Sequence, residues 1–176
     1  HGSTILAKRQ REPFAVLLPD DILVAEPPAM AQMLSVFEKY HCPVIAVEEV
    51  PTERVSLYGV IKGAAVAEGV YRVEAMVEKP RPEAAPSNLA IVGRYIFTPA
   101  IFQAIAETRP GVGGEIQITD AMVRLMASQP FYACQFQGVR YDAGSPLGML
   151  HASVEMALRR DDAGPAVRQW LETLVA

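Results

Sequence analysis

Two short apolar runs separated by one amphipathic segment constrain the fold of this chain more than any other feature. Phe14–Leu18 is a continuous apolar run that ends in Pro19-Asp20-Asp21, a pattern typical of a strand buried on both faces that stops at a turn. Ala29–Tyr40 has apolar residues at helical spacing, and Pro43–Glu49 is a second apolar run. Strand, helix and strand in this order predict a right-handed crossover between a parallel pair of strands.

The rest of the chain alternates between strand and helix patterns. Val60–Ile61 and Val70–Val77 are predicted strands set off by turns at Gly63 and Gly69, and the proline-rich Lys79–Ser87 is a predicted surface loop. The remaining predicted elements are a strand at Asn88–Phe97, a helix with Thr98 as N-cap and Pro99 at its first position, a helix at Glu115–Ser128, a strand at Phe131–Gln137, a helix capped by Ser145, and a helix at Pro165–Leu174. The predicted fold class is α/β, with a mixed, partly parallel central sheet flanked by helices.

Composition and charge exclude several kinds of protein. The chain has 176 residues with a net charge of −4, and it lacks the basic stripe that nucleic-acid binding requires. No apolar run approaches the roughly 20 residues that span a bilayer, and no signal peptide is visible, so we expect a cytoplasmic protein without a membrane partner. Cys42 and Cys134 are interpreted as buried reduced thiols, with a disulfide as the alternative. The three histidines are not at zinc-ligand spacing.

Acidic residues follow two predicted strand ends. Asp20 lies where the first strand stops, and Asp142 lies in the Tyr141-Asp142-Ala143-Gly144 turn. Ligands of open α/β sheets collect beyond strand ends, and Mg²⁺ prefers carboxylate oxygens, so the two aspartates would share one metal ion if the fold brings them together. The alternatives are that Asp20 caps the turn or the next helix and that Asp142 lies in an ordinary surface turn.

Glu78 and Lys79 form a second candidate site at the end of the Val70–Val77 strand. A carboxylate accepts hydrogen bonds from sugar hydroxyls, and a lysine neutralises a phosphate. The alternative is a solvated ion pair. Gly93 interrupts the Asn88–Phe97 strand, which often marks close approach of a ligand or another backbone. The Gly111–Gly114 segment does not fit a dinucleotide fingerprint, and no Gly-x-Ser-x-Gly elbow supports hydrolase chemistry.

Several motifs, in order and spacing, resemble the bacterial UTP–glucose-1-phosphate uridylyltransferases, from about Glu12 to the C-terminus. The motifs are LLPDD at 17–21, LYGV at 57–60, VEKP at 77–80, APSNLAIVGRY at 85–95, GEIQITDA at 114–121 and YDAG at 141–144. Related sugar-1-phosphate nucleotidylyltransferases share several of these elements but not the long APSNLAIVGRY run. The resemblance implies a Rossmann-like, nucleotide-diphospho-sugar transferase-like fold.

The resemblance also implies a reaction and roles for single residues. Glucose-1-phosphate attacks the α-phosphorus of UTP in line, giving UDP-glucose and pyrophosphate, with Mg²⁺ as cofactor. Asp20 matches a catalytic, magnesium-binding aspartate, and Asp142 matches an aspartate near the metal and the phosphates. Lys79 matches a catalytic lysine that contacts the sugar phosphate. The remaining matches are substrate-binding residues, namely Gly59, Glu78, Val92 and Gly93.

Two departures from the family pattern stand out. Ala143 replaces a cysteine inside a tight turn, with little expected effect. The family's glycine-rich nucleotide-binding loop has no counterpart here, so we expect an N-terminally truncated form: residues 1–11 are a tag remnant or non-native leader, and 12–176 are the sugar-binding part. The Phe14–Leu18 strand would then expose an apolar edge. The alternative functions are a non-catalytic UDP-glucose or glucose-1-phosphate binding fragment, a related sugar-1-phosphate nucleotidylyltransferase, or an inert fragment.

The resemblance further implies a homo-oligomer. The C-terminal helix carries Trp170 and Leu171, which could form the interface between copies. The alternative for Trp170 is packing in the core of its own chain.

Overall fold

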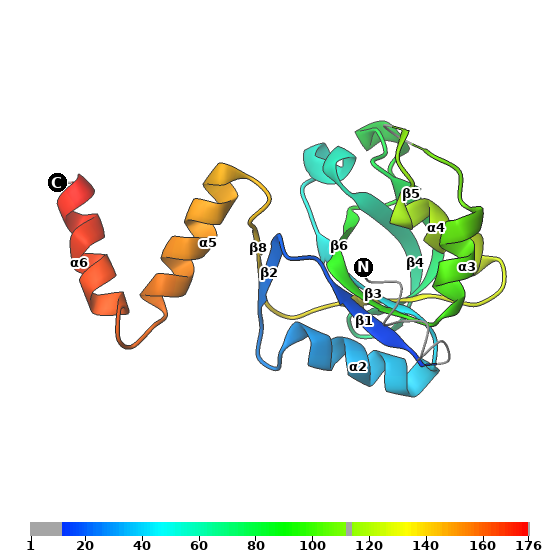
Figure 1. The fold of residues 1–176 in the computed structure, drawn as a ribbon, viewed down its shortest axis with the longest axis horizontal. Coiled ribbons are helices and arrows are strands. Elements are labelled where there is room, and N and C mark those ends of the chain that lie inside the picture. The colour runs from blue at the N-terminus through cyan, green and yellow to red at the C-terminus, as the bar shows by residue number, and fades with distance from the viewer. Residues whose placement is uncertain (1–11, 112–113, 176) are drawn as a thin grey trace.

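The computed structural model describes residues 12–111 and 114–175 as a mixed sheet with helices on both faces (Figure 1). The prediction for residues 1–11 lies outside the described residues. Six strands form the main sheet, in the spatial order β1 (Phe14–Leu17), β6 (Leu89–Phe97), β3 (Val44–Glu49), β7 (Tyr132–Gln135), β5 (Val70–Glu78) and β4 (Gly59–Ala67). A separate two-stranded ribbon consists of β2 (Asp21–Val24) and β8 (Val139–Asp142). The predicted mixed α/β class is confirmed, since β3 and β7 pair in parallel and the other pairs are antiparallel.

Five helices and two short 3-10 segments accompany these strands, and α5 and α6 follow the last of them. They are α2 (Ala29–Tyr40), η1 (Thr52–Leu57), η2 (Pro82–Ala84), α3 (Ala100–Glu107), α4 (Ile118–Met126), α5 (Pro146–Leu158) and α6 (Gly164–Val175), among the residues that the structure describes. Ser145 caps α5 as predicted, because its Oγ accepts a hydrogen bond from the Gly148 amide at 3.1 Å. The predicted cap at Thr98 is wrong: Pro99 takes the cap position, and the Gln129 side chain donates to the Thr98 hydroxyl instead.

Strand β3 is buried on both faces, as its continuous apolar sequence predicts. Val44 and Ala46 pack under α2, whereas Ile45 and Val47 pack against the cluster that includes α3 and α4. The sheet is therefore the middle of three layers, with α2 on one face and α3 and α4 on the other (Figure 1).

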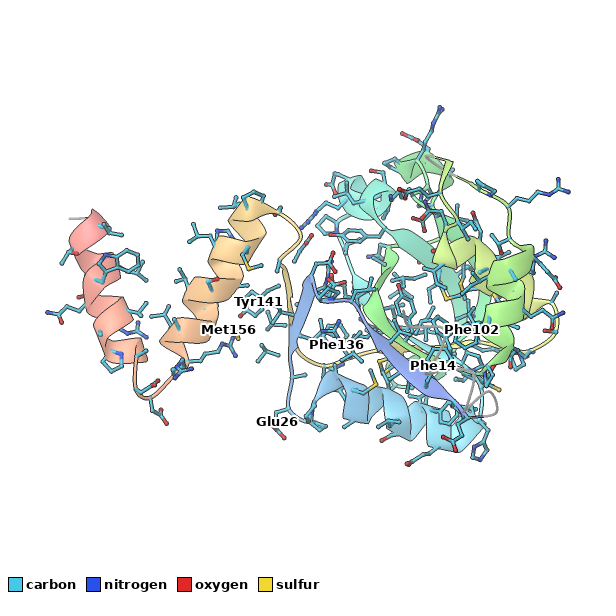
Figure 2. The ribbon with its side chains drawn as sticks, viewed as in Figure 1. Phe14, Glu26, Phe102, Phe136, Tyr141 and Met156 are labelled. Atoms are coloured by element: carbon cyan, nitrogen blue, oxygen red, sulfur yellow. The ribbon has the colours of Figure 1, made fainter. Side chains whose placement is uncertain are left out.

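Strand β1 differs from its prediction in two ways. It is not paired with β3, because β6 lies between them and runs antiparallel to both. It is also not buried on both faces: Leu17 is 56% exposed, and β6 is its only neighbour within the described residues. Its inner side chains do pack, and Phe14 stacks on Phe102 of α3 with ring centroids 5.1 Å apart (Figure 2). The apolar run correctly predicted a strand, but only Phe14 and Val16 pack against the core, whereas Ala15 and Leu17 are exposed.

Strand β4 is longer than predicted, and the Gly63 turn is wrong. Gly63 lies inside β4, where a register shift against β5 follows Lys62. A Cβ at Gly63 would lie 3.0 Å from the Tyr71 Cβ and 3.1 Å from the Arg72 carbonyl oxygen. The glycine therefore serves close strand contact rather than a turn.

Helices α5 and α6 extend away from the sheet (Figure 1). Trp170 on α6 is 54% exposed, so it does not pack in the core of its own chain.

Both cysteines are free thiols; Cys134 is buried, while Cys42 is partly exposed, which corrects the prediction that both are buried. No helix in the described part of the chain has the length and apolar character needed to cross a membrane.

Candidate functional site

The β2–β8 ribbon brings the predicted metal-binding aspartates together. β2 pairs antiparallel with β8 so that Asp21 lies opposite Asp142, and the Ala143 amide donates to the Asp20 carbonyl at 2.7 Å. The sequence predicted only turns at these two places. Short strands whose side chains are half-buried do not show a clear alternation, so the pairing had no local signal.

The carboxylates of Asp20 and Asp142 converge beside Gly144. A Cβ at Gly144 would lie 3.2 Å from the Asp142 Oδ1 and 3.4 Å from the Asp20 Oδ2, so both oxygens lie close to one point. Asp20 does not cap the following helix, because α2 begins after Pro28 with no side-chain cap. Within the described residues, no three His, Cys, Asp or Glu side chains form a metal-binding group. Two carboxylates fit Mg²⁺, which binds few protein ligands and keeps several waters.

Asp21 is a buried carboxylate that joins this ribbon to the main sheet, and the sequence prediction missed its role. It is 7% exposed, and its Oδ2 accepts a hydrogen bond from the Gly93 amide at 2.8 Å. A Cβ at Gly93 would lie 2.5 Å from that oxygen and 2.7 Å from the Leu18 Cβ. The predicted close approach at Gly93 is therefore an approach by Asp21 and Leu18.

Gly93 lies at an irregular part of β6. Ile45 of β3 pairs with Tyr95 and Val47 pairs with Ile91, so β6 has extra residues between these pairs. On its other side, β4 pairs with the start of β6 and β1 pairs with its end. The segment around Gly93 thus lies between two neighbouring strands, and bulges of this kind are common beside active sites.

Glu78, Lys79 and Gly59, which the resemblance predicts to bind the sugar, form a second group, called the sugar cluster after that prediction. Gly59 pairs with Glu78 across β4 and β5, and the Lys79 amide donates to the Tyr58 carbonyl at 2.9 Å. The Glu78 carboxylate is mostly buried and lies 3.9 Å from the Lys79 ammonium, which is about half exposed. The ion pair given as the alternative is therefore present, but its carboxylate is not freely solvated.

Two backbone features make the sugar cluster unusual. Lys79 has φ of 45°, a left-handed conformation that non-glycine residues rarely adopt and that occurs often at functional sites. A Cβ at Gly59 would lie 2.9 Å from the Thr119 Oγ1 and 3.2 Å from the Glu78 Oε2. The glycine therefore leaves room for a buried threonine and for the carboxylate, and Thr119 is a neighbour that the sequence prediction missed.

Val92 differs from the other predicted substrate-binding residues. Its side chain is buried in the cluster under α2, whereas Ile91 and Tyr95 pack on the α3 and α4 face. Ile91 also borders the Gly59 position, at 3.1 Å from a Cβ built there. Only the backbone of Val92 is therefore placed to contribute to a site on the Gly59 side of the sheet.

Arg140 of β8 contacts four residues of the site. Its Nε donates to Asp21, and its Nη1 lies 2.9 Å from the Glu48 carboxylate and 3.4 Å from the Tyr58 hydroxyl. Its Nη2 lies 3.9 Å from the Asp142 carboxylate. Burial lowers the pKa of Arg140, but these hydrogen bonds and carboxylate charges outweigh it and raise the net pKa, so the guanidinium stays charged.

Tyr95 connects the two groups electrostatically. Burial raises the pKa of the Tyr95 hydroxyl, and the charges of Asp21, Glu78 and Asp20 raise it further. The carboxylates of both groups therefore act on one side chain of β6. An open pocket of about 490 Å³ lies beside Asp142 and Arg140, and its lining also includes Glu48, Arg54, Ser145 and His151. Glu78, Lys79 and Gly59 are not among its lining residues. Tyr141, labelled in Figure 2, marks where β8 passes into α5 beside this pocket.

Comparisons with known proteins give consistent matches. The nucleotidyl transferase family model matches residues 2–158. A UTP–glucose-1-phosphate uridylyltransferase of Pseudomonas aeruginosa is 46% identical over 144 residues, covering 81% of this chain and 52% of that protein. The enzyme of the same name from Staphylococcus epidermidis is 43% identical over 163 residues, covering 93% of this chain and 57% of that protein.

A solved structure of UDP-glucose pyrophosphorylase complexed with UDP-glucose superposes with a TM-score of 0.84. It is 48% identical in sequence, and the match covers 88% of this chain and 60% of that one. The chain thus spans a little over half the length of the curated relatives that it matches.

Proposed function

The chain belongs to the nucleotidyl transferase family, and from that premise we propose that it carries the sugar-binding and metal-binding part of a UTP–glucose-1-phosphate uridylyltransferase. In this reaction an oxygen of the glucose-1-phosphate phosphate forms a bond to the α-phosphorus of UTP. The bond from that phosphorus to the β-phosphate oxygen breaks, so pyrophosphate leaves and UDP-glucose remains. The observation that carries the proposal is the mostly buried Glu78 carboxylate beside Gly59 and Lys79, on a chain whose relatives bear this enzyme's name.

The sugar cluster supplies the groups that glucose-1-phosphate requires. The Glu78 carboxylate accepts hydrogen bonds from glucose hydroxyls, and its partial burial limits competition from water. The half-exposed Lys79 ammonium neutralises the sugar phosphate. Catalysis by this site is a matter of positioning and charge neutralisation, with no covalent intermediate on the protein.

Asp20 and Asp142 are the residues that would hold Mg²⁺, since their carboxylates converge beside Gly144. The bound ion would supply positive charge that neutralises the phosphates of the nucleotide. Asp142 is already oriented without it, because its Oδ1 accepts a hydrogen bond from the Gly144 amide at 3.0 Å.

Calorimetric titration of the chain with UDP-glucose in MgCl₂ tests the proposal, with UDP and dTDP-glucose as comparison ligands. We expect UDP-glucose to bind more tightly than UDP, because only the former occupies the sugar cluster, and about as tightly as dTDP-glucose, because both carry the same sugar. EDTA or Asp142→Asn should weaken UDP-glucose binding about tenfold, the size expected for one lost charged ligand. Equal binding of UDP and UDP-glucose, or no binding of either, would contradict the proposal.

A cytoplasmic location belongs to the same proposal. The two free thiols fit a reducing compartment.

We also propose that the protein is a homo-oligomer joined through α5 and α6. These helices extend away from the sheet (Figure 1), and they carry exposed apolar side chains, namely Leu147, Met149, Leu150, Trp170 and Leu174. Such a concentration of exposed apolar surface is typical of an interface.

In sedimentation or light-scattering measurements, Trp170→Ser combined with Leu174→Glu should convert the oligomer to a monomer. Leu57→Glu, which changes an equally exposed leucine on η1, should leave the mass unchanged. A monomeric parent chain would overturn this assignment.

A further inference from the structure

Arg140 is a nearly buried cation that none of the predicted roles includes. Its side chain is 9% exposed, and it lies in the middle of β8, two residues before Asp142. Burying a charged group is unfavourable unless partners compensate it, and Arg140 has three carboxylates and one phenol around its guanidinium. These partners come from β2, β3, β8 and the residue that precedes β4.

On one side, Arg140 reaches the metal-binding aspartates and the bulge of β6. It contacts the carboxylate of Asp142 at 3.9 Å and donates to one oxygen of Asp21. The other oxygen of Asp21 accepts the Gly93 amide at 2.8 Å. Arg140 therefore fixes the orientation of a carboxylate that in turn holds the irregular backbone of β6.

On the other side, Arg140 reaches the sugar cluster. Its guanidinium lies 5.1 Å from the centre of the Tyr58 ring and 3.4 Å from the Tyr58 hydroxyl. Tyr58 directly precedes Gly59, and its carbonyl accepts the amide of Lys79 at 2.9 Å. The same arginine thus contacts the residue that holds the left-handed backbone of Lys79.

We infer that Arg140 is a positioning residue that fixes the distance between the metal-binding carboxylates and the sugar cluster. The inference rests on the proposed function for the identity of the ligands that the two groups bind. The contacts that Arg140 makes do not depend on that function. A planar guanidinium with several fixed N–H directions can bond Asp21, Glu48 and Tyr58 together, whereas the single ammonium of a lysine cannot satisfy all three directions. In this role Arg140 acts through Asp21, Asp142 and Tyr58.

Hydrogen exchange of Arg140→Lys, measured without ligand, tests the positioning role directly. The amides of Gly93 and Lys79 should exchange at least about tenfold faster, since each depends on a residue that Arg140 holds. The Val73 amide, which donates to the Phe131 carbonyl in the core, should keep its protection. Arg124→Lys is the matched control, because Arg124 pairs with Glu107 on the surface. Unchanged Gly93 and Lys79 amides would overturn the inference, and so would an equal loss at Val73, which means general destabilisation.

Binding separates this inference from the proposed function. If the parent chain binds UDP-glucose, Arg140→Lys should weaken that binding about tenfold. The effects of Arg140→Lys and Glu78→Gln should not be additive, because both act on the contact between Glu78 and the sugar. Additive effects of these two substitutions on binding would contradict the positioning role of Arg140. If the parent chain does not bind UDP-glucose, the proposed function fails, while the exchange of Gly93 and Lys79 still decides the role of Arg140.

Discussion

Gly93→Ala should lower the free energy of unfolding by about 2–4 kcal/mol, which combines overpacking with the loss of a hydrogen bond to a buried carboxylate. The added methyl group would lie 2.5 Å from the Asp21 Oδ2 and 2.7 Å from the Leu18 Cβ. Neither neighbour can yield freely, because Asp21 also bonds Arg140 and the Leu18 amide donates to the Gly93 carbonyl at 2.9 Å. Urea unfolding followed by circular dichroism measures the change.

Gly114→Ala is the matched control for this prediction. Gly114 has φ of 77°, and a Cβ there meets nothing within 4 Å, so its cost comes only from backbone conformation. That cost should be about 1 kcal/mol. A loss at Gly93 no greater than the loss at Gly114 would mean that Asp21 and Leu18 can move aside, and that the close approach is not structurally required.

Glu78→Gln should raise the dissociation constant for UDP-glucose about 10- to 150-fold, the range for losing a charged hydrogen bond of about 1.5–3 kcal/mol. The substitution keeps the size of the side chain, so Gly59 and Thr119 still have room beside it. It removes the negative charge that accepts from sugar hydroxyls and that faces Lys79 at 3.9 Å. Titration calorimetry of the variant, in the same MgCl₂ buffer as the parent chain, measures the loss.

Glu83→Gln provides the comparison for charge alone. Glu83 lies on η2, five residues along the same loop, and its side chain is exposed. Its removal changes net charge by the same amount and should leave the dissociation constant within about a factor of two, since exposed charges at a distance are screened. Equal effects of the two substitutions would show that Glu78 acts through bulk electrostatics. No effect of Glu78→Gln would remove Glu78 from the site.

Local features of the fold could be predicted well where a pattern had one physical solution. The amphipathic Ala29–Tyr40 helix agrees with its prediction, because only one face of that segment can be buried. The cap at Ser145 also agrees, since serine followed by proline satisfies the first turn of a helix directly. The cap at Thr98 did not, because Gln129, distant in sequence, forms a hydrogen bond with its hydroxyl.

The candidate site was predicted in parts rather than as a whole. Asp20, Asp142, Glu78 and Lys79 were identified from their places at predicted strand ends, and Gly59 through a resemblance of motifs. The structure places them in two groups whose roles stay predictions. Asp21 and Arg140 were missed because nothing in either local sequence marks a buried ion pair. Their importance depends on residues 119 positions apart meeting across the β2–β8 ribbon.

The sequence by itself determined the strands of the main sheet and the helices, but not β2 and β8, because hydrophobic periodicity, caps and prolines act over a few residues. Only the tertiary structure decided which strands are neighbours. β6, which follows β1 and β3 in the sequence, lies between them in the sheet. The predicted parallel pair of β1 and β3 is therefore replaced by two antiparallel pairs with β6. The physical reason is that strand pairing and the compensation of buried charge are sums over contacts distant in sequence, so no local pattern encodes them.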